Sequence, residues 1–251
     1  MAADGLTRRA LALGLALAPF RASGAPEVLS GREATVDGRR ILLADILTPT
    51  EGPYAKKSSD ALAAALVEPV DVAPLSTDRW GRTLARATRR RDGASIAQLI
   101  LAAGLARVRP ETDDRVEIGA YLRVEAAARG AGRGLWGSPD HRVFNANAGY
   151  APVGAFALVA GEIRSAAARR SRLYLNFGED YRTDVTASAM ARAARRWPEF
   201  EYAAEAGASR EAWAAAVSGF AGRRIRVRGY VAWINGPSID LTHPDQAQWL
   251  D

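Results

Sequence analysis

The chain has 251 residues, with 34 lysines and arginines against 28 aspartates and glutamates, so its formal net charge is +6. Its apolar fraction of 48% and charged fraction of 25% are ordinary for a globular protein, and they exclude a disordered, collagen-like or coiled-coil chain. It has no cysteine, which excludes disulfides, thiolate metal sites and a cysteine nucleophile. At roughly 150 residues per domain, we expect two small domains.

The first 25 residues have the order of a secretory signal peptide. Arg8 and Arg9 precede an apolar run over residues 10–20, and small residues follow up to Ala25. The run is shorter than the roughly 20 residues of a membrane-spanning helix. We therefore expect export to the periplasm or the medium, with residues 1–25 removed and no transmembrane anchor left. An ordinary Sec signal, a twin-arginine signal and a buried N-terminal helix of a cytosolic protein are the alternatives.

Residues 26–137 predict a strand-rich domain with three helices. Asp37 and Gly38 separate two short apolar runs, as in a hairpin, and Gly104 and Gly130 end the last two helices. In chain order we expect strands at 27–36 and 39–46, a helix at 58–67, strands at 70–73 and 82–88, and helices at 95–103 and 116–129.

Residues 138–154 lose this periodicity and gather proline, glycine and asparagine, which is typical of a linker. Five further strands and one helix are expected after it, with strands at 156–165, 172–177 and 183–189, a helix at 209–217, and strands at 224–233 and 238–241. Five strands with a helix before the fourth predict a small barrel of the oligonucleotide/oligosaccharide-binding (OB) kind over residues 155–251.

Four segments of the first half carry a family resemblance when taken together and in order. They are Gly38 to Pro49, Asp78 to Ala85, Leu101 to Val108 and Glu125 to Trp136. In these segments the chain resembles the staphylococcal-nuclease-like, or thermonuclease, family over about residues 28–137. The resemblance implies a five-stranded barrel capped by three helices, in agreement with the element order. We therefore expect an α+β fold that is mainly β, with a nuclease-like barrel followed by a second, OB-like barrel.

The resemblance also implies a chemistry that this chain does not retain. Family nucleases hydrolyse phosphodiesters with one Ca²⁺, two aspartates that hold it, a glutamate that acts on water, and two arginines that face the phosphate. A hard cation neutralises the phosphate and orients attack, and arginine forks match phosphate geometry. At the matching positions the chain has Leu42 for an arginine, Leu47 for an aspartate, Thr50 for the glutamate and Arg32 for the other aspartate. Of this set, only Arg82 survives.

Three carboxylates lie within two positions of a lost one: Glu33, Asp45 and Glu51. A shift of one residue on a strand turns a side chain to the opposite face, so Glu51, in a loop, is the best placed to move into the site. The chain is therefore expected to be a pseudo-nuclease without a metal or another cofactor, with Arg82 as its one catalytic candidate. An active Ca²⁺-dependent endonuclease with a relocated metal site is the alternative.

The second half offers a basic and aromatic surface. Arg224, Arg226 and Arg228 alternate with apolar residues, which puts three cations on one strand face. Aromatic rings among basic groups are typical of single-strand binders. The candidate stacking residues are Trp80, Tyr174, Tyr181, Tyr230 and Trp233. The arginine face predicts a partner such as single-stranded DNA or RNA, or it is the solvated outer face of an edge strand.

The remaining candidates have structural interpretations. His141 and His243 have no second imidazole or cysteine at ligand spacing, so no zinc site is expected. Trp136 is expected to close the last helix of the first barrel. The sequence thus predicts an exported protein of the thermonuclease family that binds nucleic acid, or another envelope ligand, without cleaving it. The alternatives are the active nuclease and an envelope scaffold that binds protein or glycan.

Overall fold

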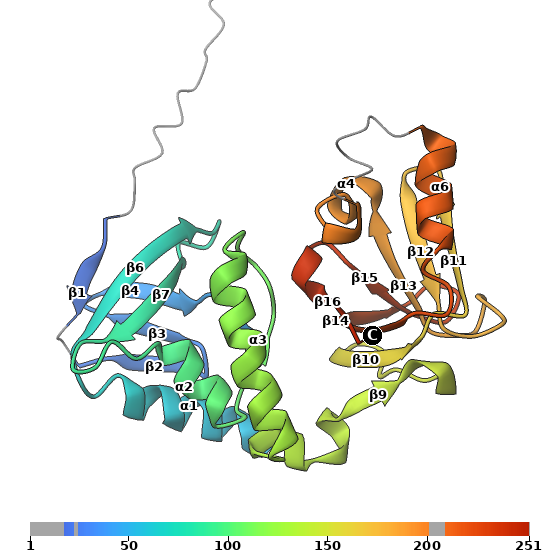
Figure 1. The fold of residues 1–251 in the computed structure, drawn as a ribbon. Coiled ribbons are helices and arrows are strands. Elements are labelled where there is room, and N and C mark those ends of the chain that lie inside the picture. Colours follow the sequence, from blue (N-terminus) through green and yellow to red (C-terminus); the bar gives the residue numbers. More distant parts are fainter. Residues whose placement is uncertain (1–17, 23–24, 201–208, 251) are drawn as a thin grey trace, which may run out of the picture.

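The computed structural model describes residues 18–22, 25–200 and 209–250. Two β-rich domains lie on either side of the long helix α3 (Arg115–Gly130), as Figure 1 shows. Most of the expected signal peptide, the arginine pair included, lies outside the described residues. Within the described part, no helix has the length and apolar character needed to cross a membrane.

The first domain is built on a six-stranded curled sheet in the order β1-β6-β7-β4-β3-β2, and β5 pairs separately with β8. The strands are β1 (Phe20–Ala22), β2 (Glu27–Ser30), β3 (Glu33–Val36), β4 (Arg39–Leu43), β5 (Ile46–Leu47), β6 (Val70–Thr77), β7 (Thr83–Arg89) and β8 (Arg107–Val108). The expected strand at 27–36 is interrupted at Gly31. There the backbone passes so close to α1 that a Cβ would stand 2.3 Å from the Ser58 Cβ. Strand β1 lies inside the expected signal peptide and pairs with β6.

Three helices cover this sheet, as expected: α1 (Gly52–Ala65), α2 (Ile96–Ala102) and α3. Helix α1 begins six residues before its predicted start, with proline in its first turn, a position where the missing N–H of proline costs nothing. The other two helices begin at side-chain caps, Ser95 and Asp114. Their inward faces bury Ile100 and Ile118 in the core of the domain.

The second domain is a curled sheet in the order β11-β12-β13-β15-β14-β10-β9, with β16 added to β14. Its strands are β9 (Val143–Asn145), β10 (Phe156–Glu162), β11 (Ser165–Arg169), β12 (Arg172–Asn176), β13 (Thr186–Met190), β14 (Arg224–Trp233), β15 (Pro237–Asp240) and β16 (Ala247–Trp249). Its helices are α4 (Ala191–Ala194) and α6 (Arg210–Ser218), and short 3₁₀ turns of the chain are η1 (Gly134–Gly137), η2 (Pro139–His141), η3 (Ala146–Ala148), η4 (Pro198–Phe200) and η5 (Pro244–Gln246). The structure confirms the expected α+β class, and the second domain is compatible with an OB-like barrel.

The segment expected to be a linker is instead part of the second domain. Strand β9 runs parallel to β10, with Val143 opposite Leu158. The Asn147 amide donates to the carbonyl oxygens of Glu162 and Phe177, and its Oδ1 accepts the Glu162 N–H. A strand of three residues is too short to show periodicity, which is why the sequence did not reveal it.

Candidate functional site

Arg82, the catalytic candidate expected from the family resemblance, is held by carboxylates of its own domain. Its Nε donates to Asp78 Oδ2 at 2.7 Å, and its Nη1 lies 3.8 Å from Glu33 Oε2. Glu33 also pairs with Arg40. Burial acts to raise the pKa of Asp78, but hydrogen bonds from Arg82 and Trp80 lower it overall. Arg82 is therefore engaged in two ion pairs within the protein.

A guanidinium stands where the resemblance places the second metal-holding aspartate. Arg32 Nη1 donates to the carbonyl oxygen of Ile46 and, at 2.8 Å, to Glu111 Oε2. The side chains of Arg32 and Glu111 are only 12% and 17% exposed. This pair links the turn before β3 to the segment after β8. A guanidinium with its own carboxylate partner therefore takes the position at which the resemblance implies an aspartate.

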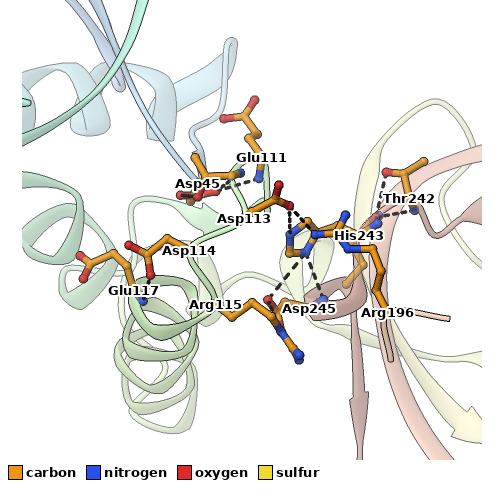
Figure 2. A network of polar contacts seen from close by, with 12 residues as sticks. Asp45, Glu111, Asp113, Asp114, Arg115, Glu117, Arg196, Thr242, His243 and Asp245 are labelled. Carbon is orange, nitrogen blue, oxygen red and sulfur yellow. Dashed lines mark hydrogen bonds and ion pairs between the residues drawn. The ribbon is translucent and has the colours of Figure 1, made fainter. Parts of the chain in front are cut away.

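Asp45, the second carboxylate near a lost position, anchors the same segment. Its Oδ1 accepts the backbone N–H groups of Glu111 at 2.7 Å and Thr112 at 2.8 Å, and its Oδ2 accepts the Thr112 hydroxyl at 2.7 Å. Figure 2 shows Asp45 pointing at this segment. Asp45 is fully buried and has a φ of +61°, which Asn and Asp tolerate better than most residues. Both of its oxygens therefore have donors.

Two of the other replaced positions, Leu47 and Thr50, lie beside residues of the second domain, whereas Leu42 lies on β4 between β3 and β7. Leu42 is 8% exposed, and Leu47 packs against a small cluster that includes Trp136. Thr50 and Glu51 are exposed and line a cavity of about 540 Å³ that residues of both domains enclose. Among the described residues, no three histidine, aspartate or glutamate side chains gather as a group that could hold a metal.

The arginine face of β14 is turned toward the first domain, which corrects one expectation. Arg228 is 1% exposed, so it is not available to a phosphate backbone. Its guanidinium makes two 2.9 Å contacts, one with each Glu125 oxygen, and donates to the carbonyl oxygen of Val108 at 3.1 Å. Arg226 is half-buried beside it, and Arg224 is exposed. The alternation put the three on one face, but along that face the chain passes from solvent at Arg224 to the contact with α3 at Arg228.

Glu125 is the buried partner of Arg228 that the sequence analysis missed. It is fully buried on α3, and besides Arg228 it accepts the Val108 N–H at 2.7 Å and contacts Arg129 at 3.4 Å. An acidic residue near the end of a helix with an arginine four positions later looks like an ordinary surface pair in a sequence. Its burial becomes evident only from its partner Arg228 on β14, about 100 residues later in the chain.

A second cavity, of about 560 Å³, opens on the sheet of the second domain. Tyr174 and Tyr181 provide aromatic wall, Arg169 and Arg172 provide cations, and the floor is neutral and polar. Its remaining lining residues are Ala167, Asn176, Thr186, Ser188, Ile234, Asn235 and Ser238. Arg172 Nη1 donates to Ser188 Oγ at 2.7 Å and to Asp240 at 2.9 Å, which fixes its guanidinium at the edge of the cavity.

The five expected stacking residues do not gather on one surface. Tyr174 and Tyr181 share the cavity just described, whereas Tyr230, 53% exposed, lines the cavity between the domains. Trp80 is 62% exposed and lies on the first domain, with the Arg79 guanidinium 4.1 Å from its ring centroid. Trp233, also exposed, lines neither cavity.

The two histidines lie at the contact between the domains. His141 Nδ1 contacts Arg107, and burial, followed by the charge of Arg107, lowers the pKa of His141. His243 is 7% exposed, and its Nδ1 accepts the Asp245 N–H at 3.1 Å. Figure 2 shows His243 facing Asp113, 4.0 Å from its Nε2. Burial lowers the pKa of His243 as well.

A comparison of the sequence with protein-family models agrees with the fold of the first domain. Residues 39–138 match the family model described as Staphylococcal nuclease homologue. The chain thus contains a staphylococcal-nuclease-like domain, which confirms the resemblance over the first half. A comparison with curated proteins found no match.

Proposed function

We propose that this protein binds single-stranded nucleic acid in the cavity on the second domain and does not cleave it. The observation that carries the proposal is the composition of that cavity, in which Tyr174 and Tyr181 stand beside Arg169 and Arg172. Base stacking on aromatic rings and backbone contacts by arginine are the two elements of sequence-tolerant single-strand binding. The cavity also lies on the sheet face and loops that OB folds use for oligonucleotides and oligosaccharides.

The absence of cleavage is supported by two of the three carboxylates near the replaced positions, Asp45 and Glu33, whereas the third, Glu51, is exposed at the cavity between the domains. Asp45 uses both oxygens on the segment at 111–112, Glu33 pairs with two arginines, and Arg32 with its own partner occupies the remaining aspartate position. A calcium ion binds through several free oxygen ligands. These residues do not fit that need, because recruiting them would break hydrogen bonds and ion pairs that the fold already uses.

We further propose that the protein is exported, to the periplasm or the medium. The support is the order of charged, apolar and small residues over the first 25 positions. Fractionation of cells with sequencing of the mature N-terminus tests this, and a start near Pro26 is expected. Recovery of the uncut chain in the cytosol would contradict it.

A titration of labelled single-stranded oligonucleotide at low and moderate salt tests binding. We expect affinity that falls with salt, and a loss of about 5- to 160-fold in Tyr174→Ala, since stacking is worth about 1–3 kcal/mol per base. Tyr150→Ala is the matched control, because Tyr150 is 58% exposed and lies outside the cavity. No binding at low salt, or an equal loss in the control, would overturn the proposal.

Assays of cleavage and of glycan binding test the two alternatives, the active nuclease and the envelope scaffold. Calcium-dependent digestion that Arg82→Ala abolishes would establish the nuclease with a relocated metal site. The hydroxyl and amide groups of the cavity floor, such as Asn176 and Ser188, also suit a sugar. Binding of glycan in place of oligonucleotide, without salt dependence, would favour the envelope scaffold.

A further inference from the structure

Where the two domains meet, four arginines lie around one buried carboxylate, that of Glu125. Glu125 pairs with Arg228 and Arg129, and its charge also acts on Arg107 and Arg226. Among the residues that the structure describes, Arg129 has no ion pair other than the one with Glu125, and Arg107 and Arg226 have none. Buried charges are costly unless they are paired, so this cluster lacks negative charge.

The excess of positive charge lies between α3 and β14. Arg226 and Arg228 lie two residues apart on one face of β14, while Glu125 and Arg129 lie one turn apart on α3. The bond between Arg228 and Glu125 joins the two rows, so that Arg226 comes near Arg129. Burial and then the charge of Arg129 lower the pKa of Arg226, as expected for neighbouring cations.

Three buried donors in this region have no acceptor within the described residues: Arg226 Nε, Arg107 Nε and Trp136 Nε1. Trp136 is 9% exposed and lies between two guanidiniums, with Arg129 5.6 Å and Arg107 5.9 Å from its ring centroid. Buried polar groups are nearly always hydrogen-bonded, and an orphaned one costs about 1–3 kcal/mol. Every orphan here is a donor, so the missing partner is an acceptor.

We propose that the contact between α3 and β14 is a binding site for a phosphate group, held chiefly by Arg129 and Arg226. Phosphate supplies more than one negative charge and several acceptor oxygens, which matches both deficits, and arginine forks bind it bidentately. The side chain of Arg129 is 18% exposed and Arg226 is half-buried, so solvent reaches the site. Free phosphate and a phosphodiester of a larger ligand share this chemistry. The site does not line the aromatic cavity, so the inference does not rest on the proposed function.

Thermal unfolding of the full chain in increasing inorganic phosphate, against chloride at equal ionic strength, tests the site. The melting temperature of the wild type is expected to rise with the logarithm of phosphate concentration, as for any ligand of the native state. Arg226→Gln should remove this rise, whereas Arg164→Gln, which alters an exposed pair with Glu162, should keep it. Without phosphate, Arg226→Gln should melt no lower than the wild type, because it removes an unpaired cation.

The oligonucleotide titration tests whether the bound phosphate group belongs to a nucleic acid strand. If the phosphate belongs to a bound strand, Arg226→Gln weakens oligonucleotide binding at least fivefold, even where inorganic phosphate alone has no effect. Loss of oligonucleotide binding in Tyr174→Ala with the phosphate response intact would separate this site from the cavity. The inference is overturned if neither response depends on Arg226, or if Arg226→Gln fails to fold in phosphate-free buffer.

Discussion

Replacing Arg228 with methionine tests whether the buried ion pair holds the two domains together. Arg228 and Glu125 have side-chain exposures of 1% and 0%, and each carboxylate oxygen is 2.9 Å from a guanidinium nitrogen. Removing one partner of a buried pair typically costs about 3–5 kcal/mol. Glu125 would keep the Val108 N–H and the contact with Arg129, and crowding among the arginines would ease. We therefore expect the lower end, about 3 kcal/mol.

Urea unfolding of the full chain measures this loss as a fall in the midpoint at constant slope. Arg164→Met is the control, because Arg164 and Glu162 form an exposed pair in the same domain, 52% and 41% accessible, and such pairs contribute about 0–1 kcal/mol. If Arg228→Met lies within 1 kcal/mol of this control, the pair does not stabilise the contact and the reasoning fails.

Three further changes test other parts of the structure. Asp45→Asn keeps the shape but weakens three accepted hydrogen bonds, so urea unfolding should show a loss of about 1–3 kcal/mol; an unchanged midpoint would contradict the anchoring role. Gly31→Ala would put a methyl 2.3 Å from the Ser58 Cβ, at a cost of about 1–3 kcal/mol in the same assay, and a neutral result would refute the close approach. The folded-state pKa of His243 is lowered by burial, so the stability that the neutral ring contributes is present above pH 6.5 and is lost as the pH falls below that value. His243→Asn keeps an N-cap acceptor, and it should make the free energy of unfolding change less with pH between pH 6.5 and pH 5 than in the wild type. An unchanged pH dependence would show that protonation of His243 does not affect stability.

The elements that the sequence predicted are those whose signals are local. Helices α2 and α3 have a side-chain cap at one end and a glycine near the other, and arginines alternate with apolar or small residues in β14 from Arg224 to Gly229, so a short window contains the evidence. Several of the strands that were missed or merged, such as β9, β11 and β16, have only three to five residues. Strand β11 follows β10 after only two residues, with no glycine or proline to mark the break. Such strands are recognisable only by the partners they pair with.

The candidate site was harder to predict because its surroundings come from distant parts of the chain. The alternation of Arg226 and Arg228 defines a face of β14, but the same pattern describes a face in water and a face against another domain. Glu125 decides between the two, and it lies 103 positions from Arg228. Because Arg228 pairs with Glu125, its guanidinium lies buried in the contact between the domains and not on the solvent face where the sequence placed it.

The arginine at position 32, where the resemblance implies an aspartate, is linked to an ion pair inside the first domain. Arg32 brings a cation to the place of an aspartate, and a buried cation requires a counter-charge, which Glu111 supplies. Glu111 in turn belongs to the segment that Asp45 holds through its backbone. An aspartate restored at Leu47, next to the Ile46 carbonyl that Arg32 contacts, would therefore compete with Glu111 for Arg32 before it could serve calcium.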